Sequence, residues 1–109
     1  MSSVGMERIR GMIGLAMRAG KLVIGTDMIC RVLPGGGAAL VVLSNTASDG
    51  TRKKLSHKCE FYEIELIEVN IDTEELGRLL GKTYTPAAVA VCDSGIAEQI
   101  KKAHEALKQ

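Results

Sequence analysis

Hydrophobic and polar positions alternate with two different periods along this chain. Near the start, four apolar residues recur at the three-to-four-residue spacing of a half-buried helix: Met6, Ile9, Ile13 and Ala16. A short apolar run at 22–24 then predicts a buried strand. A second helix is expected to begin at Thr26 and to end before Pro34, because the residue preceding a proline is disfavoured in the helical conformation. The first third of the chain therefore predicts a helix, a strand and a helix.

The rest of the pattern predicts three more strands, each followed by a helix. Continuous apolar runs at 39–44 and 87–92 are typical of strands buried on both faces, whereas 64–69 alternates apolar and acidic residues as a half-buried strand does. Ser48 and Asp72 are expected to cap the next two helices. The apolar stripe predicted for the third helix is Leu55, Cys59 and Tyr62, with Arg52, Lys53 and Lys54 toward solvent. The stripe predicted for the last helix is Ile96, Ile100, Ala103 and Leu107.

The predicted order, α-β-α-β-α-β-α-β-α, favours the α/β class. Helices that alternate with strands cover both faces of a sheet, so we expect a three-layer α/β/α sandwich around a mixed sheet of about four strands. With 109 residues, 46% of them hydrophobic, the chain can bury one core, and we expect a single domain over 1–109. The runs at 39–44 and 87–92 should be central strands, but the pattern does not determine which strands pair.

Composition bears on the cellular compartment. The chain has no run of about 18 apolar residues, which a membrane helix needs. Glu7, Arg8 and Arg10 interrupt the N-terminal region before an apolar segment develops. We therefore expect no membrane span, no signal peptide and a cytoplasmic protein.

Cysteines and histidines indicate neither a disulfide framework nor a metal site. Cys30, Cys59 and Cys92 are odd in number and widely separated, so we expect three reduced, buried thiols. His57 and His104 lack ligand partners at suitable spacing and are expected on the surface. No metal and no cofactor is implied.

Motifs that would indicate an enzyme are also absent from the sequence. Gly35-Gly36-Gly37 lacks the Gly-Lys-Ser/Thr ending of a nucleotide triphosphate loop and precedes a strand rather than a helix. Ser44, Ser48, Ser56 and Ser94 lack the surroundings of a nucleophile elbow. The sequence thus offers no set of catalytic residues.

Charge is divided unevenly although the net value is +1. Residues 1–58 carry nine Lys or Arg against three Asp or Glu, and residues 59–109 carry five against ten. The segment 60–75 holds seven acids and no base. Such a division suits a protein that binds a polyanion in one orientation, but it also fits ordinary solvated surfaces.

The segment AGKLVIGTDMICR, residues 19–31, is the most informative candidate site. Gly25 allows a bound group to approach the backbone closely, Thr26 can cap the following helix, and Lys21 and Arg31 supply positive charge. An ordinary strand-to-helix turn would use the same glycine and cap, so both interpretations stay open on this segment alone.

Four segments together resemble a known family: RAGKLVIGTDMICR, VVLSNTASDGTRKK, EELGRLLGK and SGIAEQI. Their order and separation are similar to those in the small RNA-binding ribosomal proteins of the L-seven-Ae and L-thirty-e superfamily, in its bacterial single-domain branch. The resemblance runs from about Ile9 to about Ala103 and implies the L-thirty-e-like α/β/α fold.

That resemblance implies binding to RNA, typically a kink-turn, in which an internal loop bends two helices and exposes sheared G·A pairs. Gly25, Thr26 and Arg31 match the family's glycine, small residue and basic residue. Asn45 lies where the thirty-e type has asparagine, and the loop Lys82-Thr83-Tyr84-Thr85 matches one that packs on the extruded nucleotide.

Two positions of the implied site depart from the family. Kink-turn binders often have an amide and then a glutamate after the small residue, where this chain has Asp27 and Met28. An aspartate still accepts a hydrogen bond from a guanine amino or imino group, but a methionine is a poor acceptor. The RNA-binding set implied here therefore comprises Lys21, Gly25, Thr26, Asp27, Met28, Arg31, Asn45, Lys82, Thr83, Tyr84 and Thr85.

Three functions stay in competition. The first is a non-enzymatic RNA-binding protein of the translation apparatus, whose partner is a structured ribosomal or regulatory RNA or the ribosome itself; its oligomeric state is left open, with the monomer favoured. The second is a protein-interaction adaptor that uses the acidic face at 60–75, because one fold can host several functions. The third is an enzyme with a phosphorylated substrate at Gly25, which no acid, base or nucleophile near the turn supports.

Overall fold

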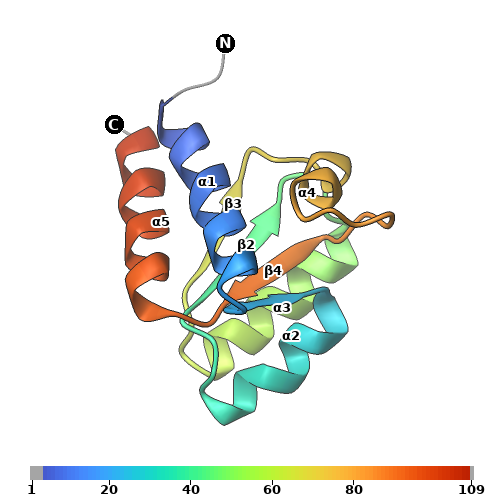
Figure 1. Cartoon of the computed structure of the whole chain (residues 1–109). Coiled ribbons are helices and arrows are strands. Elements are labelled where there is room, and N and C mark those ends of the chain that lie inside the picture. The colour runs from blue at the N-terminus through green and yellow to red at the C-terminus, as the bar shows by residue number, and fades with distance from the viewer. Residues whose placement is uncertain (1–3, 109) are drawn as a thin grey trace.

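The computed structural model describes residues 4–108 and contains every helix and strand that the pattern predicts (Figure 1). In chain order these are α1 (Val4–Arg18), β1 (Leu22–Ile24), α2 (Thr26–Val32), the 3-10 helix η1 (Leu33–Gly35), β2 (Leu40–Ser44), α3 (Asp49–Phe61), β3 (Leu66–Val69), α4 (Thr73–Leu79), β4 (Ala88–Val91) and α5 (Ser94–Leu107). Strand β1 has the predicted bounds, whereas β2, β3 and β4 are one or two residues shorter than predicted, because the outermost residues of those runs belong to the adjoining loops.

The four strands form one mixed sheet in the order β1-β4-β2-β3. Strand β4 is antiparallel to both β1 and β2, whereas β2 and β3 are parallel. Val42 of β2 lies opposite Val89 of β4, and both are fully buried. The prediction that the two continuous apolar runs form central strands is confirmed.

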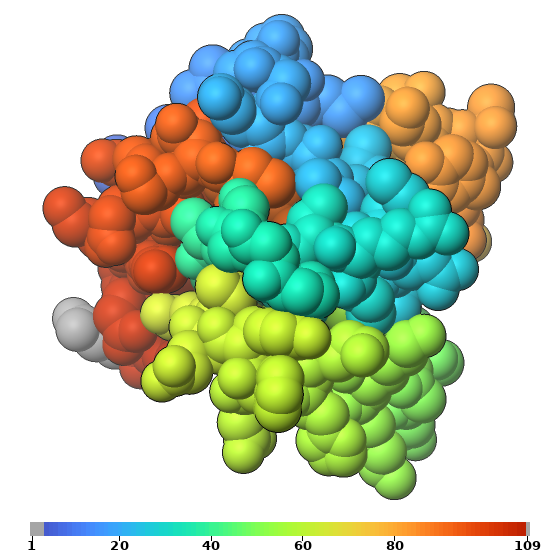
Figure 2. Space-filling model, turned by 90° about the horizontal axis from the view of Figure 1, so that it is seen from below, coloured from blue at the N-terminus to red at the C-terminus, as the bar shows by residue number. Residues whose placement is uncertain are grey.

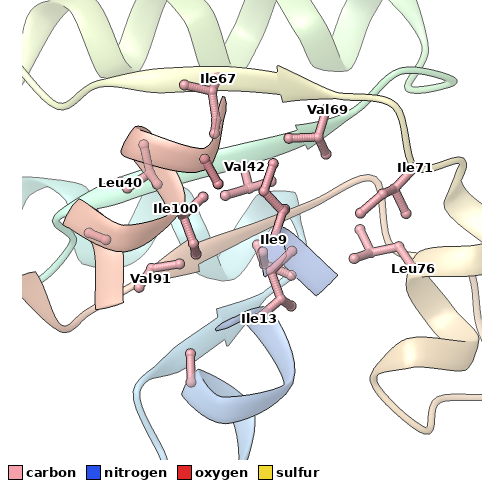
Figure 3. Close-up of a cluster of buried hydrophobic side chains, with 14 of the residues drawn as sticks. Ile9, Ile13, Leu40, Val42, Ile67, Val69, Ile71, Leu76, Val91 and Ile100 are labelled. Carbon is pink, nitrogen blue, oxygen red and sulfur yellow. The ribbon is translucent and has the colours of Figure 1, made fainter. Parts of the chain in front are cut away.

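Alternation along the strands divides the core between the two faces of the sheet. Leu40 and Val42 point to the face covered by α1, α4 and α5, while Val41 and Leu43 point to the face covered by α2, η1 and α3. Figure 3 shows the first cluster, in which Ile9 and Ile13 of α1 and Ile100 of α5 surround the valines of the sheet. The predicted α/β/α sandwich is confirmed.

Helix ends agree with the sequence at two positions and disagree at a third. Ser48 Oγ accepts from the Thr51 amide at 3.2 Å, and Asp72 Oδ1 accepts from the Glu75 amide at 2.7 Å, as predicted. Thr26 is not a cap. The N-cap of α2 is Gly25, no side chain caps the helix, and Thr26 is its first residue.

Side-chain burial corrects two further expectations. Leu107 is 40% exposed, because it lies at the rim beside Gly5 of α1, and the buried residues of α5 are Ala97, Ile100 and Ala103. The three cysteines are free thiols, but only Cys59 is buried; Cys30, within α2, and Cys92, which follows β4, are half-buried.

The two histidines differ in burial. His57 is exposed, as expected, while His104 is half-buried, and burial lowers its pKa. Among residues 4–108, no three side chains of His, Cys, Asp or Glu are grouped closely enough to hold a metal ion. No helix in the same range is long and apolar enough to cross a membrane.

Candidate functional site

Strand pairing brings three distant segments to one edge of the sheet. The amide of Gly25, at the end of β1, donates to the carbonyl of Ala88 at 3.1 Å, and the amide of Ser44, at the end of β2, donates to the carbonyl of Ala87 at 2.8 Å. The turn after β1, the loop after β2 and the loop before β4 therefore meet. We call this region the converging edge and define it by Gly25–Met28, Asn45 and the loop 82–85.

Gly25 has a backbone conformation that other residues adopt only under strain. Its φ is +98° and its ψ is 149°, in a region almost restricted to glycine. An added Cβ would meet no atom within 4 Å, so the space beside this turn is open. The turn thus presents bare backbone at the surface, beside the uncapped start of α2.

The first turns of α2 place a mixed set of side chains beside Gly25. Asp27 and Met28 are exposed, and Thr26 is half-buried. Arg31, one turn further on, directs its Nη1 to the sulfur of Met28 at 3.8 Å. Lys54 of α3 lies 3.9 Å from the carboxylate of Asp27, so α3 also supplies a cation to this edge.

Asn45 is held in place by Asn70 and Arg52, neither of which the sequence assigned to the candidate site. Its Nδ2 donates to Oδ1 of Asn70 at 2.6 Å, which presents two side-chain amides side by side at the ends of β2 and β3. Arg52 donates to the Asn45 and Ala47 carbonyls at 3.4 and 3.2 Å and pairs with Glu68 at 2.9 Å. Arg52 is therefore half-buried and fixes the loop, rather than facing solvent as predicted.

Hydroxyl groups fasten the loop after β2 to the loop after β3. Ser44 is fully buried; its Oγ donates to the Ile71 carbonyl at 2.7 Å and lies 3.2 Å from the Thr46 amide, whose hydrogen bond it accepts. Thr46 Oγ1 accepts from the amide of Thr73 at 3.0 Å. These bonds give both loops a defined geometry.

The loop Lys82–Thr85 is seated on α4 through a glycine. The Lys82 amide donates to the Gly77 carbonyl at 2.9 Å, and an added Cβ on Gly77 would lie only 2.6 Å from the Tyr84 carbonyl oxygen. Only a residue without a side chain allows this approach. Thr83 and Thr85 are exposed, and Tyr84, 54% exposed, presents an aromatic ring at the edge.

Lys21 does not lie beside the turn, contrary to expectation. It precedes β1, and its carbonyl accepts from the amide of Cys92, which follows β4. Lys21 is also close enough to oppose the rise that burial causes in the pKa of Cys92. A three-residue strand separates Lys21 from Gly25 by about 13 Å, at about 3.3 Å per residue, so the two lie at opposite edges of the sheet.

The structure thus brings most of the predicted residues together and leaves one apart. Residues 25–28, Asn45 and 82–85 share the converging edge, Arg31 adjoins it along α2, and Lys21 lies away. Sequence reasoning missed Asn70, Arg52, Lys54, Thr46 and Gly77. A signal existed for Asn70, a polar residue directly after a predicted strand, but the others depend on tertiary contacts.

The match to a protein family extends over nearly the whole domain. The model of the Ribosomal protein L7Ae/L30e/S12e/Gadd45 family matches residues 7–101. The chain belongs to this family. The mixed sheet flanked by helices, derived above from side-chain patterns, is consistent with that membership.

Curated relatives and solved structures agree with this assignment. The chain is 37% identical to the RNA-binding protein YlxQ of Bacillus subtilis over 89 aligned residues, and the aligned region covers 82% of this chain and 87% of that protein. It is 30% identical over 80 residues to the large ribosomal subunit protein eL30 of Methanosarcina mazei, covering 73% and 74%. A protein described as of unknown function from Bacillus halodurans C superposes with a TM-score of 0.82 at 31% identity, over 89% of this chain and 96% of that one.

A more distant structure shows the same fold. The Giardia lamblia 15.5kD RNA binding protein superposes with a TM-score of 0.76 at 15% identity, over 96% of this chain and 92% of that one. At this identity the likeness establishes the architecture alone.

Proposed function

We propose that this protein is a non-enzymatic RNA-binding protein of the translation apparatus, which recognises a kink-turn or a similarly bent RNA at the converging edge. Family membership and relatives named as RNA-binding and ribosomal proteins support an RNA partner. The observation that carries the location is the meeting of Gly25, Asn45 and the loop 82–85 at one edge.

The chemistry of this edge suits an RNA whose bases are exposed by a bend. The side chain of Asp27 can accept from guanine, and the paired amides of Asn45 and Asn70 offer both donors and acceptors for base edges. Tyr84 offers a ring on which an unstacked base can lie. Arg31 supplies positive charge for a phosphate close by.

The adaptor hypothesis loses support because the acidic segment is not a free face. Glu65 lies 3.7 Å from Lys101, Glu68 pairs with Arg52, and Glu75 pairs with Arg10. Asp72 caps α4. Four of the seven acids in 60–75 therefore already have structural roles, which leaves Glu60, Glu63 and Glu74 as a scattered remainder.

The enzyme hypothesis gains no support from the edge either. The hydroxyls of Ser44 and Thr46 are used in hydrogen bonds that hold the loops, so neither is available as a nucleophile. We expect the protein to act by binding alone, as a cytoplasmic monomer.

Binding titrations at several salt concentrations test the proposal. We expect a kink-turn RNA to bind more tightly than a straight duplex of equal length, with an affinity that falls steeply as salt rises. Arg31→Ala should weaken binding by about 1–3 kcal/mol and lower the salt slope by about one phosphate contact. The control, Lys102→Ala on α5, should change neither.

A second variant tests the base-reading part of the site. Met28→Glu introduces an acceptor where kink-turn binders have one and should tighten binding to an RNA with tandem G·A pairs. Equal and shallow salt curves for the native chain, Arg31→Ala and Lys102→Ala would show that the turn serves only the fold. Cosedimentation with ribosomes, with and without ribonuclease, separates a ribosomal partner from a free regulatory RNA.

A further inference from the structure

Helices α2 and α3 leave the converging edge together and run side by side beneath the sheet. Strands β1 and β2 are both antiparallel to β4 and hence parallel to each other, so the helices that follow them start at the same edge. Figure 2 shows α2, in cyan to teal, against α3, in green to yellow-green. The two helices form one continuous surface that begins at the candidate site.

Helix α3 carries a concentration of positive charge on this surface. Between residues 52 and 58 the sequence RKKLSHK has four Lys or Arg and no Asp or Glu. Lys54 and Lys58 are four residues apart and therefore share one flank, with a rise of about 6 Å between them. That flank faces α2, because Lys54 reaches Asp27 of α2.

Arg31 adds a third cation from the neighbouring helix. Asp27 and Arg31 are four residues apart on the exposed side of α2. Arg31 therefore lies one turn beyond Asp27 on α2, just as Lys58 lies one turn beyond Lys54 on α3. We call Arg31, Lys54 and Lys58 the basic seam. Its positive charges follow the two helices away from the converging edge.

The acid within the seam does little to neutralise it. The pair between Lys54 and Asp27 spans 3.9 Å, and the two side chains are 51% and 87% exposed. An ion pair of this kind contributes little to stability, so Lys54 can exchange the carboxylate for a phosphate at small cost.

Acidic side chains lie at the start of α4, on the other side of the converging edge. Helix α4 lies on the opposite face of the sheet from α2 and α3; Asp72 is its N-cap and Glu74 lies in its first turn. These two acids line a shallow hollow together with Thr46 and Thr73. A phosphate backbone at this edge is thus attracted toward α3 and repelled from α4.

We propose that the basic seam binds the phosphates of one helical arm of the RNA, next to the bent element that occupies the converging edge. This inference rests on the proposed function and adds which way the RNA lies: one arm follows α2 and α3, and the other leaves the protein. Helix α3 has 13 residues and is about 20 Å long, enough to accompany a strand over several phosphates.

The test compares two double variants. Lys54→Gln/Lys58→Gln, the seam variant, removes two positive charges from the basic seam. Lys102→Gln/Lys108→Gln, the control, removes two positive charges from exposed lysines of α5 and its C-cap. Each protein is titrated with a kink-turn RNA that has two long arms, and with two versions in which one arm or the other is trimmed to the internal loop. Circular dichroism checks that all variants are folded.

Loss of two phosphate contacts should lower the slope of log K against log salt by about 1.4–1.8. When salt is raised from about 50 to about 200 mM, the association constant of the native protein should then fall by a factor about seven to twelve times larger than that of the seam variant. We expect this difference to vanish when one particular arm is trimmed and to persist when the other is. Lys58→Gln alone, which keeps the Asp27 pair, should show about half of the change in slope.

The outcomes separate this inference from the proposed function. If the native chain binds none of the bent RNAs, the proposed function fails. If it binds them and the seam variant matches the α5 control, or if trimming either arm has the same effect, the seam is not an arm-binding surface.

Discussion

Replacing Gly77 with alanine tests how the loop of the converging edge is positioned. An added Cβ would lie 2.6 Å from the Tyr84 carbonyl oxygen, whereas ordinary contact starts at 3.4 Å, so backbone must move by the difference of about 0.8 Å. The neighbouring bond from the Lys82 amide to the Gly77 carbonyl, now 2.9 Å, would be strained by the same movement. Loop 82–85 should therefore shift away from α4.

The magnitude follows from two opposing effects. Overpacking of this kind typically costs about 1–3 kcal/mol, and alanine in place of a helical glycine returns about 0.5–1 kcal/mol. We expect Gly77→Ala to lower the free energy of unfolding by up to about 2.5 kcal/mol, with a fall in Tm of roughly 4 °C or more per kcal/mol. Amide hydrogen exchange at Lys82 should become faster.

Gly11 provides the matched control. It lies within α1, is exposed, and an added Cβ would meet nothing within 4 Å. Gly11→Ala should raise stability by about 0.5–1 kcal/mol through the helix effect alone. Were Gly77→Ala to raise Tm in the same way and leave the exchange of Lys82 unchanged, the close approach of loop and helix would be refuted.

Three further predictions concern the core and the titrating groups. Val42→Asp places an unpaired charge in a fully buried strand, and circular dichroism should detect little folded protein; a well-folded variant would contradict the central position of β2. Burial, with a smaller effect of Cys30, raises the pKa of the Cys59 thiol to about 11. In the native protein a thiol reagent should therefore label half-buried Cys30 well before Cys59. Labelling in the reverse order would overturn the burial assigned to Cys59. Burial, and then the charge of Lys108, lower the pKa of His104 in the folded protein, so the unfolded chain binds the proton more readily. Stability should therefore decrease as the pH falls below the unfolded pKa of 6.5. His104→Gln should flatten the plot of Tm against pH in that window, and an unchanged plot would count against this role of His104.

The sequence by itself determined the element order, the central strands and two of the helix caps. These features depend on local regularities, since a continuous apolar run such as 40–44 has to be covered on both faces wherever it lies. Ser48 and Asp72 act on amides three residues away, so their role needs no knowledge of the rest of the fold. The family resemblance predicted that Gly25 and the loop 82–85 belong to one site.

Only the tertiary structure decided how that site is assembled. Because β4 pairs antiparallel with both β1 and β2, its first residue, Ala88, adjoins both Gly25 and Leu43, and no local pattern encodes that choice of partners. The same pairing explains the error at Lys21, which is four residues from Gly25 in sequence but at the opposite end of a strand. Arg52 and Gly77 approach carbonyls only five to seven residues away in the chain. Those carbonyls belong to loops whose place is set by sheet order and packing, so a local pattern does not predict either contact.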